Sequence, residues 1–282
     1  MIIIADSGST KTEWRIVDGK EQEKSYITSG LNPYLLTEDN IYDLLNQELK
    51  PLAGLKVSEI FFYGTGCNNE EKEGVIRNSL NRFYSADRVH VASDLLGAAR
   101  SLCMNEKGVA CIIGTGSNSC YYDGNVIVSN VSPLGYILGD EGGGAFIGRN
   151  LLSGVLKKQL PGYVIDNFYK AYPLTRNEIL DNVYSRPFPN RFLGQFTKFV
   201  ADNIHVPELQ NIIVSGFDDF IRRNVLQYPE AKDLPIHFTG SVAYYFRSYL
   251  EELIKKYRLH PGKISLKPMD DLVIYHINNL RS

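Results

Sequence analysis

The sequence has few cysteines, and their spacing fits neither a metal site nor a disulfide framework. There are four of them in 282 residues, Cys67, Cys103, Cys111 and Cys120. No C-x-x-C pair occurs, and no group of cysteines and histidines has the spacing of zinc ligands. The pattern favours reduced, mostly buried thiols.

Charge of one sign and long apolar runs are lacking as well. The 30 basic and 32 acidic side chains leave a formal net charge of −2, so no basic surface for nucleic acid is expected. No stretch approaches the ~18 apolar residues that a membrane helix needs. The apolar start of the chain already reaches Asp6, which is too short for a signal peptide. We therefore expect a cytoplasmic protein with neither a nucleic-acid nor a membrane partner.

Two common nucleotide-binding motifs are missing too. The G-x-x-x-x-G-K-[ST] spacing of a P-loop does not occur, and no G-x-G-x-x-G stands between a strand and a helix. The chain is therefore expected to be neither a P-loop nucleotidase nor a Rossmann dehydrogenase.

Short apolar strands and amphipathic helices alternate along the chain, which predicts an α/β fold. The first 30 residues predict a β-meander in which Asp18-Gly19 is a hairpin turn. The strands predicted in the first half are 2–5, 12–17, 24–28, 60–63 and 89–91. The helices predicted there are 38–49, 69–84 and 95–104.

The pattern restarts at Val109, where an apolar strand, a glycine-rich turn and a second strand follow one another. When the two β-meanders that begin at residues 2 and 109 are overlaid, Gly8-Ser9 falls on Gly116-Ser117, which predicts a duplicated meander domain. The chain length also favours about two domains, and the duplication predicts that they are two lobes of one repeated fold. The strands predicted here are 109–113, 120–122, 126–128, 235–239 and 264–266. The predicted helices are 142–158, 162–171, 176–185, 190–203, 207–227, 242–258 and 270–281.

Three glycine-rich turns are the candidate sites of chemistry, at Asp6 to Thr12, Gly114 to Asn118 and Phe238 to Val242. Glycine lets a backbone approach a ligand closely, and turn amides and hydroxyls can donate to phosphate oxygens. A carboxylate at a strand end, such as Asp6, can hold Mg²⁺ through water. Each turn alone is also compatible with an ordinary polar turn. Together they favour a polyphosphate clamp with room for a base beside the third turn.

These three motifs resemble the phosphate-one, phosphate-two and adenosine motifs of the actin, heat-shock chaperone and sugar-kinase superfamily. Within it the chain is most similar to the BadF/BadG/BcrA/BcrD ATPase family and its N-acetylglucosamine kinases, on the further motifs Gly30–Pro33, Ser93–Ala98 and Leu138–Gly144. The resemblance covers essentially the whole chain. It implies a duplicated ribonuclease-H-like (actin-like ATPase) α/β fold with a nucleotide and sugar cleft between two lobes. The expected lobes are 1–107, joined by the C-terminal helix 268–282, and 108–267.

Asp94 is the candidate catalytic residue. It follows an apolar strand and precedes a helix, so the residues alone leave two interpretations open, a helix N-cap and a carboxylate aimed into a cleft. The resemblance implies the second, a general base that takes the proton of a sugar hydroxyl as it attacks the γ-phosphate. The implied reaction converts N-acetylglucosamine to N-acetylglucosamine 6-phosphate, with ATP and Mg²⁺ as cofactors and a homodimer as an open option.

The resemblance also implies the other residues of the site. Those implied for the nucleotide are Gly8, Ser9, Thr10, Lys11, Gly114, Thr115, Gly116, Ser117, Gly240 and Ser241. Those implied for the sugar are Asn32, Gly66, Asp94, Gly135, Asp140 and Gly144, and Asp6 is implied for the metal. From the residues alone, Asn32 can equally be a turn residue, Asp140 a helix cap and Lys11 a solvated side chain.

Two other functions fit parts of the pattern. Activator ATPases of radical dehydratases and reductases resemble the chain in fold, and hold an iron–sulfur cluster through cysteines. Here no short cysteine-rich glycine loop occurs. A non-catalytic sugar sensor would need an added helix-turn-helix segment, for which the strand starting at residue 2 leaves no room. The residues do not distinguish N-acetylglucosamine from glucosamine, N-acetylmuramic acid or glucose.

Overall fold

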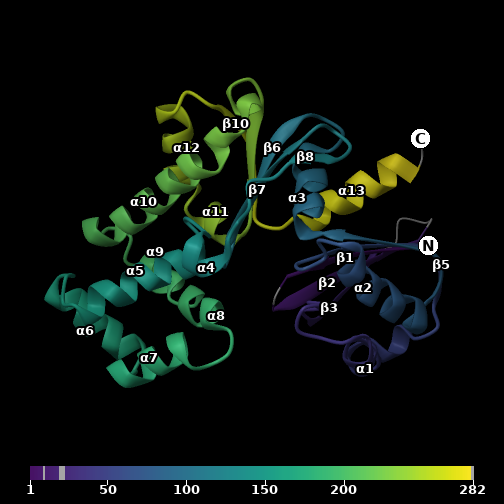
Figure 1. Cartoon of the computed structure of the whole chain (residues 1–282), viewed down its shortest axis with the longest axis horizontal. Helices are drawn as coiled ribbons and strands as arrows, with labels where there is room; N and C mark the ends of the chain where they lie inside the picture. Colours follow the sequence, from purple (N-terminus) through teal and green to yellow (C-terminus); the bar gives the residue numbers. More distant parts are fainter. Residues whose placement is uncertain (9, 19–22, 281–282) are drawn as a thin grey trace. The chain divides into compact units, whose positions relative to one another are not determined.

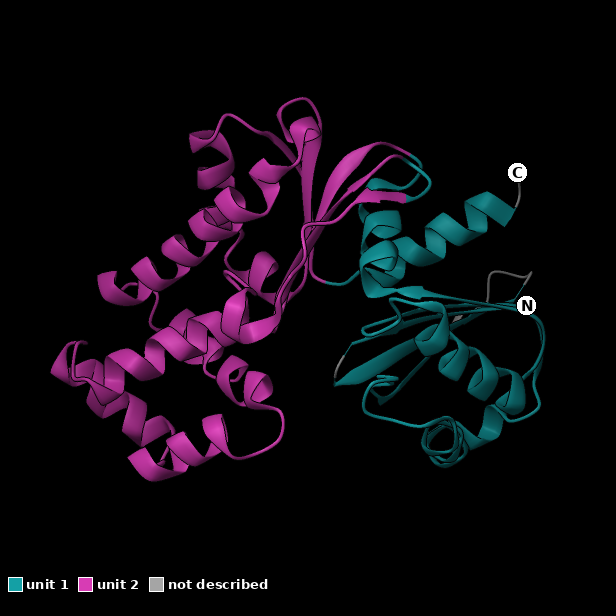
Figure 2. Ribbon diagram, in the orientation of Figure 1, with its two compact units in different colours: residues 1–105, 124–126, 267–282 teal, residues 106–123, 127–266 magenta. Residues whose placement is uncertain are grey.

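The computed structural model describes residues 1–8, 10–18 and 23–280. Ser9 of the first phosphate turn and Gly19 of the predicted Asp18-Gly19 hairpin lie outside the described residues. The chain divides into two compact units (Figure 2). Unit 1 comprises Met1–Asn105, Gly124–Val126 and Lys267–Ser282, and unit 2 comprises Glu106–Asp123 and Ile127–Leu266. Each unit is built on its own β-sheet.

Unit 1 contains a five-stranded sheet of order β3-β2-β1-β4-β5 (Figure 1). The first three strands form the predicted antiparallel meander, and β4 and β5 run parallel to β1. The strands are β1 (Ile2–Ser7), β2 (Lys11–Val17), β3 (Glu23–Ser29), β4 (Lys56–Gly64) and β5 (Ser85–Ser93). The helices are α1 (Glu38–Glu48), α2 (Glu70–Phe83), α3 (Asp94–Cys103) and α13 (Met269–Leu280), with a 3-10 turn η1 (Lys50–Leu52).

Alternation along β1 assigns its side chains to two cores, because successive residues of a strand point to opposite faces. Ile3 and Ala5 pack in a core with residues of α1 and α2, whereas Ile2 and Ile4 pack with residues of α13. Asp6 continues the second series at the end of the strand and is paired in register with Glu13 of β2. The sheet therefore carries two carboxylates on its α13 face.

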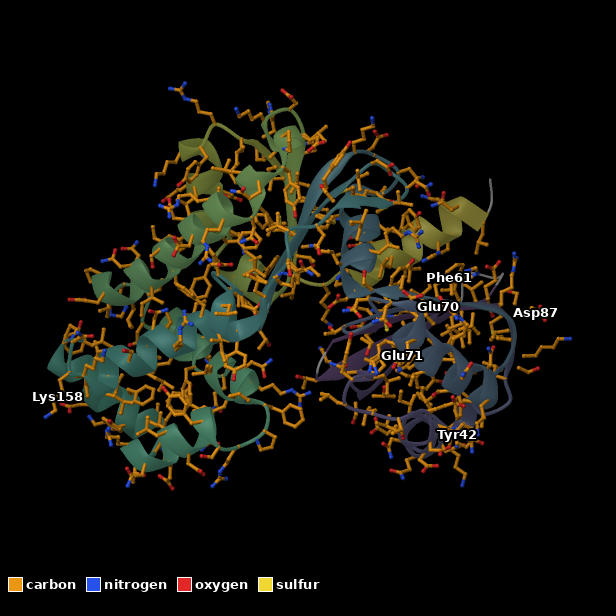
Figure 3. The ribbon with its side chains drawn as sticks, in the orientation of Figure 1. Tyr42, Phe61, Glu70, Glu71, Asp87 and Lys158 are labelled. Atoms are coloured by element: carbon orange, nitrogen blue, oxygen red, sulfur yellow. The ribbon has the colours of Figure 1, made fainter. Side chains whose placement is uncertain are left out.

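Helices α3 and α13 are fixed to this face by polar and aromatic contacts. Arg100 of α3 donates a hydrogen bond to the Tyr63 hydroxyl at 2.8 Å, and this hydroxyl lies 2.8 Å from His276 Nε2 of α13. Phe61, labelled in Figure 3, stacks on His276 with ring centroids 3.8 Å apart. Burial lowers the pKa of His276 to about 3, so the imidazole is neutral at neutral pH. These contacts hold α3, the helix that Asp94 begins, and α13 against the sheet.

Unit 2 repeats this topology with a sheet of order β10-β9-β6-β7-β8. Strands β6 and β7 are antiparallel, as are β7 and β8, while β9 is parallel to β6 and β10 to β9. The strands are β6 (Gly108–Ile113), β7 (Ser117–Tyr122), β8 (Ile127–Ser129), β9 (Pro235–Thr239) and β10 (His260–Ser265). The same strand order in both sheets confirms the predicted duplication.

The helices of unit 2 lie mostly between β8 and β9 in the sequence (Figure 1). They are α4 (Gly135–Leu138), α5 (Gly144–Leu156), α6 (Gly162–Ala171), α7 (Arg176–Tyr184), α8 (Pro189–Gly194), α9 (Thr197–Asp202), α10 (Pro207–Arg223), α11 (Ser241–Tyr245) and α12 (Arg247–Lys256), with 3-10 turns η2 (Val225–Gln227) and η3 (Pro229–Lys232). Within the described ranges, no helix has the length and apolar character needed to cross a membrane.

Register corrects the overlay of the two glycine-rich hairpins. The last paired residues are Ser7 with Thr12 in the first hairpin and Ile113 with Ser117 in the second. Both turns therefore begin with a glycine, so Gly8 corresponds to Gly114 and the predicted match of Gly8 with Gly116 is wrong. The error arose because glycine both opens and closes the second turn, which is one residue shorter.

Two predicted long helices are each broken into two. The predicted helix 190–203 consists of α8 and α9, and the predicted helix 242–258 consists of α11 and α12. At the first break, a Cβ on Gly194 would lie 3.3 Å from Thr115 Cγ2 of the second hairpin. Gln195 and Phe196 between the two helices keep right-handed helical dihedrals, so the break interrupts the regular helix beside a turn from another part of unit 2 without reversing the chain.

Candidate functional site

Asp94 does not cap helix α3. The residue before it, Ser93, is the N-cap, and its hydroxyl accepts a hydrogen bond from the Leu96 N–H at 3.2 Å. The Asp94 carboxylate instead accepts the Thr65 hydroxyl at Oδ2 (2.6 Å) and the Leu95 N–H at Oδ1 (2.9 Å). The N-cap interpretation of Asp94 is therefore wrong, and its carboxylate is held by a side chain from the end of β4.

The electrostatics of unit 1 couple Asp94 to Asp6. Burial, together with the charges of Asp94 and Glu13, raises the pKa of Asp6 to about 7, and the charge of Lys11 acts in the opposite direction. Burial also raises the pKa of Asp94, which the hydrogen bonds from Thr65 and Leu95 partly offset. Two half-buried carboxylates that repel one another are a favourable place for a cation.

This pair of carboxylates fits a magnesium ion bound together with phosphate. No group of three histidine, cysteine or acidic residues able to hold a metal exists within the described residues. Mg²⁺ in nucleotide sites takes one or two carboxylates, with water and phosphate oxygens completing its octahedron. Asp6 is poorly solvated, lies near the charges of Asp94 and Glu13, and is only partly compensated by Lys11, so the residues present fit this mode of binding.

A hydrogen-bonded network joins the predicted residues of unit 1. The Thr65 N–H donates to the Ser7 carbonyl at 2.9 Å, and the Ser7 hydroxyl accepts the Leu31 N–H at 3.0 Å. The next residue, Asn32, accepts the Tyr34 N–H at its Oδ1 (2.9 Å). Gly66 has φ +88°, and a Cβ there would lie 2.7 Å from this Oδ1. Asp94, Asn32 and Gly66 are thus brought together within one unit.

Sequence reasoning did not connect the side chains of Ser7 and Thr65 to Asp94. Ser7 is fully buried, with its hydroxyl 2.8 Å from the Thr12 hydroxyl, and Thr65 joins the Ser7 backbone to the Asp94 carboxylate. The signal that could have found them is their place at the carboxyl ends of two neighbouring parallel strands, where ligand sites of α/β sheets lie.

The first phosphate turn is only partly described. Gly8 donates its N–H to the Lys11 carbonyl at 3.0 Å, and Thr10 accepts the Gly30 N–H at 3.0 Å. The side chains of Thr10 and Lys11 are exposed, so they are accessible to a phosphate and equally to solvent. The alternatives for Lys11 therefore stay open.

The second phosphate turn is clamped by the segment from Asp140 to Gly144. The Asp140 carboxylate accepts the Ser117 N–H at 3.2 Å, and a Cβ on Gly116 would lie 2.7 Å from it. Gly144 donates its N–H to the Gly114 carbonyl at 2.8 Å. Burial raises the pKa of Asp140. The structure thus brings Asp140 and Gly144 to the second hairpin of unit 2.

Gly135 stands apart from this clamp. It is exposed, has φ +74°, and a Cβ there would meet nothing within 4 Å. Its backbone conformation accounts for the glycine. Among the described residues, no contact joins it to Asp140 beyond the turn that leads from α4.

A cavity of about 480 Å³ lies in unit 2. It is lined by three of the residues predicted to bind the nucleotide, Gly114, Thr115 and Ser241. The second hairpin and α5 contribute glycine and threonine, and α9 and α11 contribute apolar, aromatic and charged side chains. The lining residues are Gly114, Thr115, Gly144, Gly194, Thr197, Lys198, Ala201, Asp202, Ser241, Val242, Tyr245 and Phe246. No local signal identified the residues of α9, because they reach the cavity only through the packing of α8 and α9.

Gly240 does not line this cavity but precedes Ser241, which does. It has φ +110°, and a Cβ there would lie 2.4 Å from the Ile113 carbonyl oxygen. Only glycine allows β9 to turn into α11 this close to the second hairpin. Gly240 therefore brings Ser241 to the cavity without lining it.

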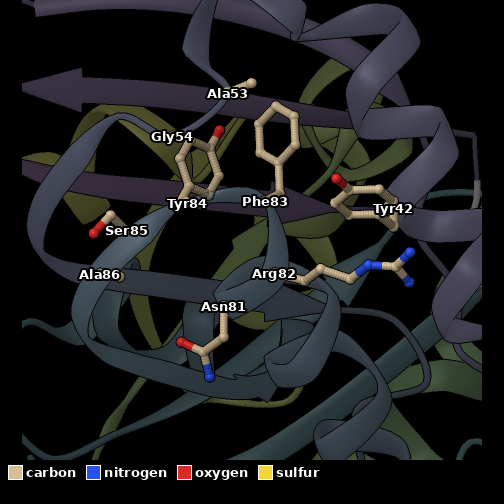
Figure 4. Close-up of a pocket in the computed structure, with 9 residues that line it drawn as sticks. All are labelled: Tyr42, Ala53, Gly54, Asn81, Arg82, Phe83, Tyr84, Ser85 and Ala86. Atoms are coloured by element: carbon tan, nitrogen blue, oxygen red, sulfur yellow. The ribbon is translucent and has the colours of Figure 1, made fainter.

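A second, open cavity of about 590 Å³ lies in unit 1 (Figure 4). It borders the start of β5, whereas Asp94 follows the end of this nine-residue strand, about 26 Å away at ~3.3 Å per residue. Arg82 there is already paired with Asp39 at 2.7 Å and lies 3.9 Å from the Tyr42 ring centroid. This cavity is separate from the candidate site.

Comparison with known proteins places the fold. No protein-family model matches the chain, and no curated protein matches it. Among solved structures, a Porphyromonas gingivalis protein described as "Putative N-acetylglucosamine Kinase" is 45% identical, with a TM-score of 0.95 over 99% of this chain and 100% of that one. A Chromobacterium violaceum protein with the same description is 16% identical, with a TM-score of 0.74 over 97% and 98%.

A more distant similarity extends the fold to another group. A ROK family glucokinase from Streptomyces griseus, solved with glucose and AMPPNP, is 13% identical, with a TM-score of 0.55 over 100% of this chain and 99% of that one. At such low identity the likeness concerns the fold alone. The two duplicated sheets are those of the actin-like ATPase and sugar-kinase fold.

Proposed function

Because the chain belongs to the same family as the Porphyromonas gingivalis protein, we propose that it is an ATP-dependent sugar kinase acting on an amino sugar. The proposed reaction phosphorylates the 6-hydroxyl of N-acetylglucosamine. We further propose that the family is a branch of the BadF/BadG/BcrA/BcrD ATPases, on the three glycine-rich motifs and the Asp94 motif.

The observation that carries the proposal is the state of the Asp94 carboxylate. It is released from helix capping by Ser93 and oriented by Thr65 at 2.6 Å. In the reaction, one Asp94 oxygen accepts the proton of the sugar hydroxyl while the sugar oxygen bonds to the γ-phosphorus. The bond from that phosphorus to the β–γ bridging oxygen breaks, and ADP leaves. A positioned base contributes ~10²–10⁴-fold to the rate.

Substrate contacts are proposed for both units. In unit 1, Asn32 and Gly66 would contact the sugar, since the network through Ser7 and Thr65 links them to Asp94. In unit 2, Asp140, Gly144 and Gly135 would contribute the remaining sugar contacts. The cavity of unit 2 would hold the nucleotide, with phosphates toward the glycines of the second hairpin. Gly8, Ser9, Thr10 and Lys11 would bind phosphate from unit 1.

Asp6 would hold Mg²⁺, which neutralises phosphate charge when bound. The charge of the ion would also remove the electrostatic cost that raises the pKa of Asp6.

The experiment is an ADP-release assay with ATP and Mg²⁺ over four sugars: N-acetylglucosamine, glucosamine, N-acetylmuramic acid and glucose. We expect the highest kcat/KM with N-acetylglucosamine and no release without sugar. A higher kcat/KM with another of the four sugars would change the proposed substrate and leave the proposed kinase activity standing. Release of ADP that no sugar stimulates would contradict the kinase and favour an activator ATPase. Sugar binding without ADP release would favour a sensor.

A further inference from the structure

We propose that Thr65 is a positioning residue for Asp94. By orienting the Asp94 carboxylate, Thr65 affects the turnover of the enzyme and not its affinity for either substrate. This inference rests on the proposed function, since it concerns the proposed base. It goes beyond that function by assigning a role to a residue whose side chain is not expected to touch the reacting atoms.

The two oxygens of the Asp94 carboxylate are fixed by different parts of the chain. Oδ2 accepts the Thr65 hydroxyl at 2.6 Å, and Oδ1 accepts the N–H of Leu95 at 2.9 Å. A carboxylate offers about four lone-pair positions, so positions remain for a sugar hydroxyl. Two hydrogen bonds on different oxygens also restrict rotation of the carboxylate plane, which the Leu95 bond alone would not do. The direction of the free lone pairs is therefore determined in part by Thr65.

Thr65 is itself held rigidly. Its N–H donates to the Ser7 carbonyl at 2.9 Å, which continues the pairing of β1 with β4 past the strand ends. On one side, a Cβ on Gly64 would lie 2.5 Å from the Phe62 ring. On the other, Gly66 has φ +88° and lies against Asn32. The segment therefore has little freedom to move the Thr65 hydroxyl away from Asp94.

This arrangement fixes the position of the proposed base, Asp94, relative to the other proposed site residues of unit 1. Ser7, which accepts from Thr65, ends the strand that leads into the first phosphate turn. The Ser7 hydroxyl accepts the N–H of Leu31, the residue before Asn32. One short segment thus relates the base to both the phosphate turn and the proposed sugar contact. Precision of this kind is required for catalysis, since misplacing a base by about 1 Å costs ~10²-fold in rate.

A purely structural role predicts a different outcome. Thr65 is half-buried, and its hydroxyl makes a single hydrogen bond within the described chain, to Asp94. If that bond only stabilised the fold, its loss would lower the melting temperature and leave turnover per folded molecule unchanged. If it aims the base, its loss lowers kcat and leaves KM for sugar and ATP nearly constant.

The test compares Thr65→Val, Thr65→Ser and Asp94→Asn with wild type in kcat, both KM values and melting temperature. Valine keeps the branched shape without the hydroxyl, and serine keeps the hydroxyl. We expect Thr65→Val to lower kcat about 10–100-fold with each KM within about threefold, and Thr65→Ser to stay within about threefold of wild type. Ser58→Ala, which removes a β4 hydroxyl bonded to the Met1 carbonyl, is the control and should retain wild-type kcat.

The double variant Thr65→Val/Asp94→Asn separates this proposal from the proposed function. If Thr65 acts through Asp94, the double variant should be no slower than Asp94→Asn alone. If Thr65→Val has the kcat of wild type, the positioning role is overturned. The same holds if Thr65→Ser loses as much kcat as Thr65→Val, and in both cases the proposed kinase activity stands. Full turnover in Asp94→Asn would overturn the base and the positioning role together. A wild-type protein without sugar-dependent turnover would overturn the proposed function as well.

Discussion

Ser93 caps helix α3 and thereby leaves the carboxylate of its neighbour Asp94 free of that role. The Ser93 hydroxyl accepts the Leu96 N–H at 3.2 Å, and the Asp94 carboxylate turns to Thr65 and Leu95. A serine at the cap satisfies the helix end without a charge. The structural and the proposed catalytic roles are thus divided between adjacent residues.

Replacing Asp94 with asparagine should remove most turnover. Asparagine keeps the size of the side chain but cannot accept the sugar proton, so we expect kcat to fall ~10²–10⁴-fold. ATP and sugar affinity, measured by calorimetry, should change little. The matched control is Ser93→Ala, which should lower the unfolding free energy by about 1 kcal/mol through loss of the cap and keep measurable turnover. Near-wild-type kcat in folded Asp94→Asn would refute its role as base.

Asp6→Asn should stabilise the protein at high pH. Burial, Asp94 and Glu13 raise the pKa of Asp6 to about 7 in the folded state, above its value of about 4 in the unfolded chain. Stability from the neutral form is therefore full below pH ~4 and is lost as the pH rises to ~7. We expect the variant to exceed wild type by about 1–3 kcal/mol at pH 8 and by less at pH 5, in urea unfolding without nucleotide.

An advantage that is equal at both pH values would show that charge on Asp6 is not the cause. Kinase activity should be lost in the same variant, because the proposed Mg²⁺ site needs the Asp6 carboxylate. Higher stability with lower activity is typical of functional sites that hold unfavourable charge.

Gly240→Ala should destabilise unit 2, whereas Gly114→Ala should be tolerated structurally. A Cβ on Gly240 would lie 2.4 Å from a backbone oxygen at φ +110°, while one on Gly114 would meet nothing within 4 Å. We expect a loss of about 2–4 kcal/mol for the first variant and less than about 1 kcal/mol for the second. Denaturant midpoints without ligand compare the two. Similar midpoints would mean that the β9–α11 turn adapts more easily than its geometry indicates.

Protein purified without oxygen should be colourless and hold no stoichiometric iron. All four cysteines are buried, and burial raises the pKa of both Cys67 and Cys103 to about 12. Cluster ligation requires cysteines that lie close together, and the described residues contain no group of three or more histidine, cysteine or acidic side chains able to hold a metal. Iron and sulfide analysis of the purified protein checks this. A brown protein with both elements would instead support the activator ATPase.

The parts of the fold with local signals were predictable from the sequence. The meanders, the glycine-rich turns and the helix that follows Asp94 were each identified from a few consecutive residues. The break between α8 and α9, which lies where Gly194 approaches Thr115 of a distant hairpin, was not. A single sequence also could not show that Gly8 and Gly114 occupy equivalent positions in the two hairpins, because this depends on the strand register within each hairpin.

The site shows the same division. Asp94 was predicted as the base from its motif, whereas the sequence could not show which of the two adjacent residues, Ser93 or Asp94, bonds the Leu96 N–H and caps the helix. The contacts of Ser7 and Thr65 were not predicted, because they join strands that are far apart in the sequence. The α9 side chains of the unit 2 cavity were missed for the same reason.

The most direct test of the account is to identify the product. Wild-type protein is incubated with ATP, Mg²⁺ and N-acetylglucosamine, and the phosphorylated species are followed by phosphorus NMR and mass spectrometry. The account predicts N-acetylglucosamine 6-phosphate and ADP in equal amounts, formed by wild type and at most slowly by Asp94→Asn. ADP with inorganic phosphate and no sugar phosphate would contradict it.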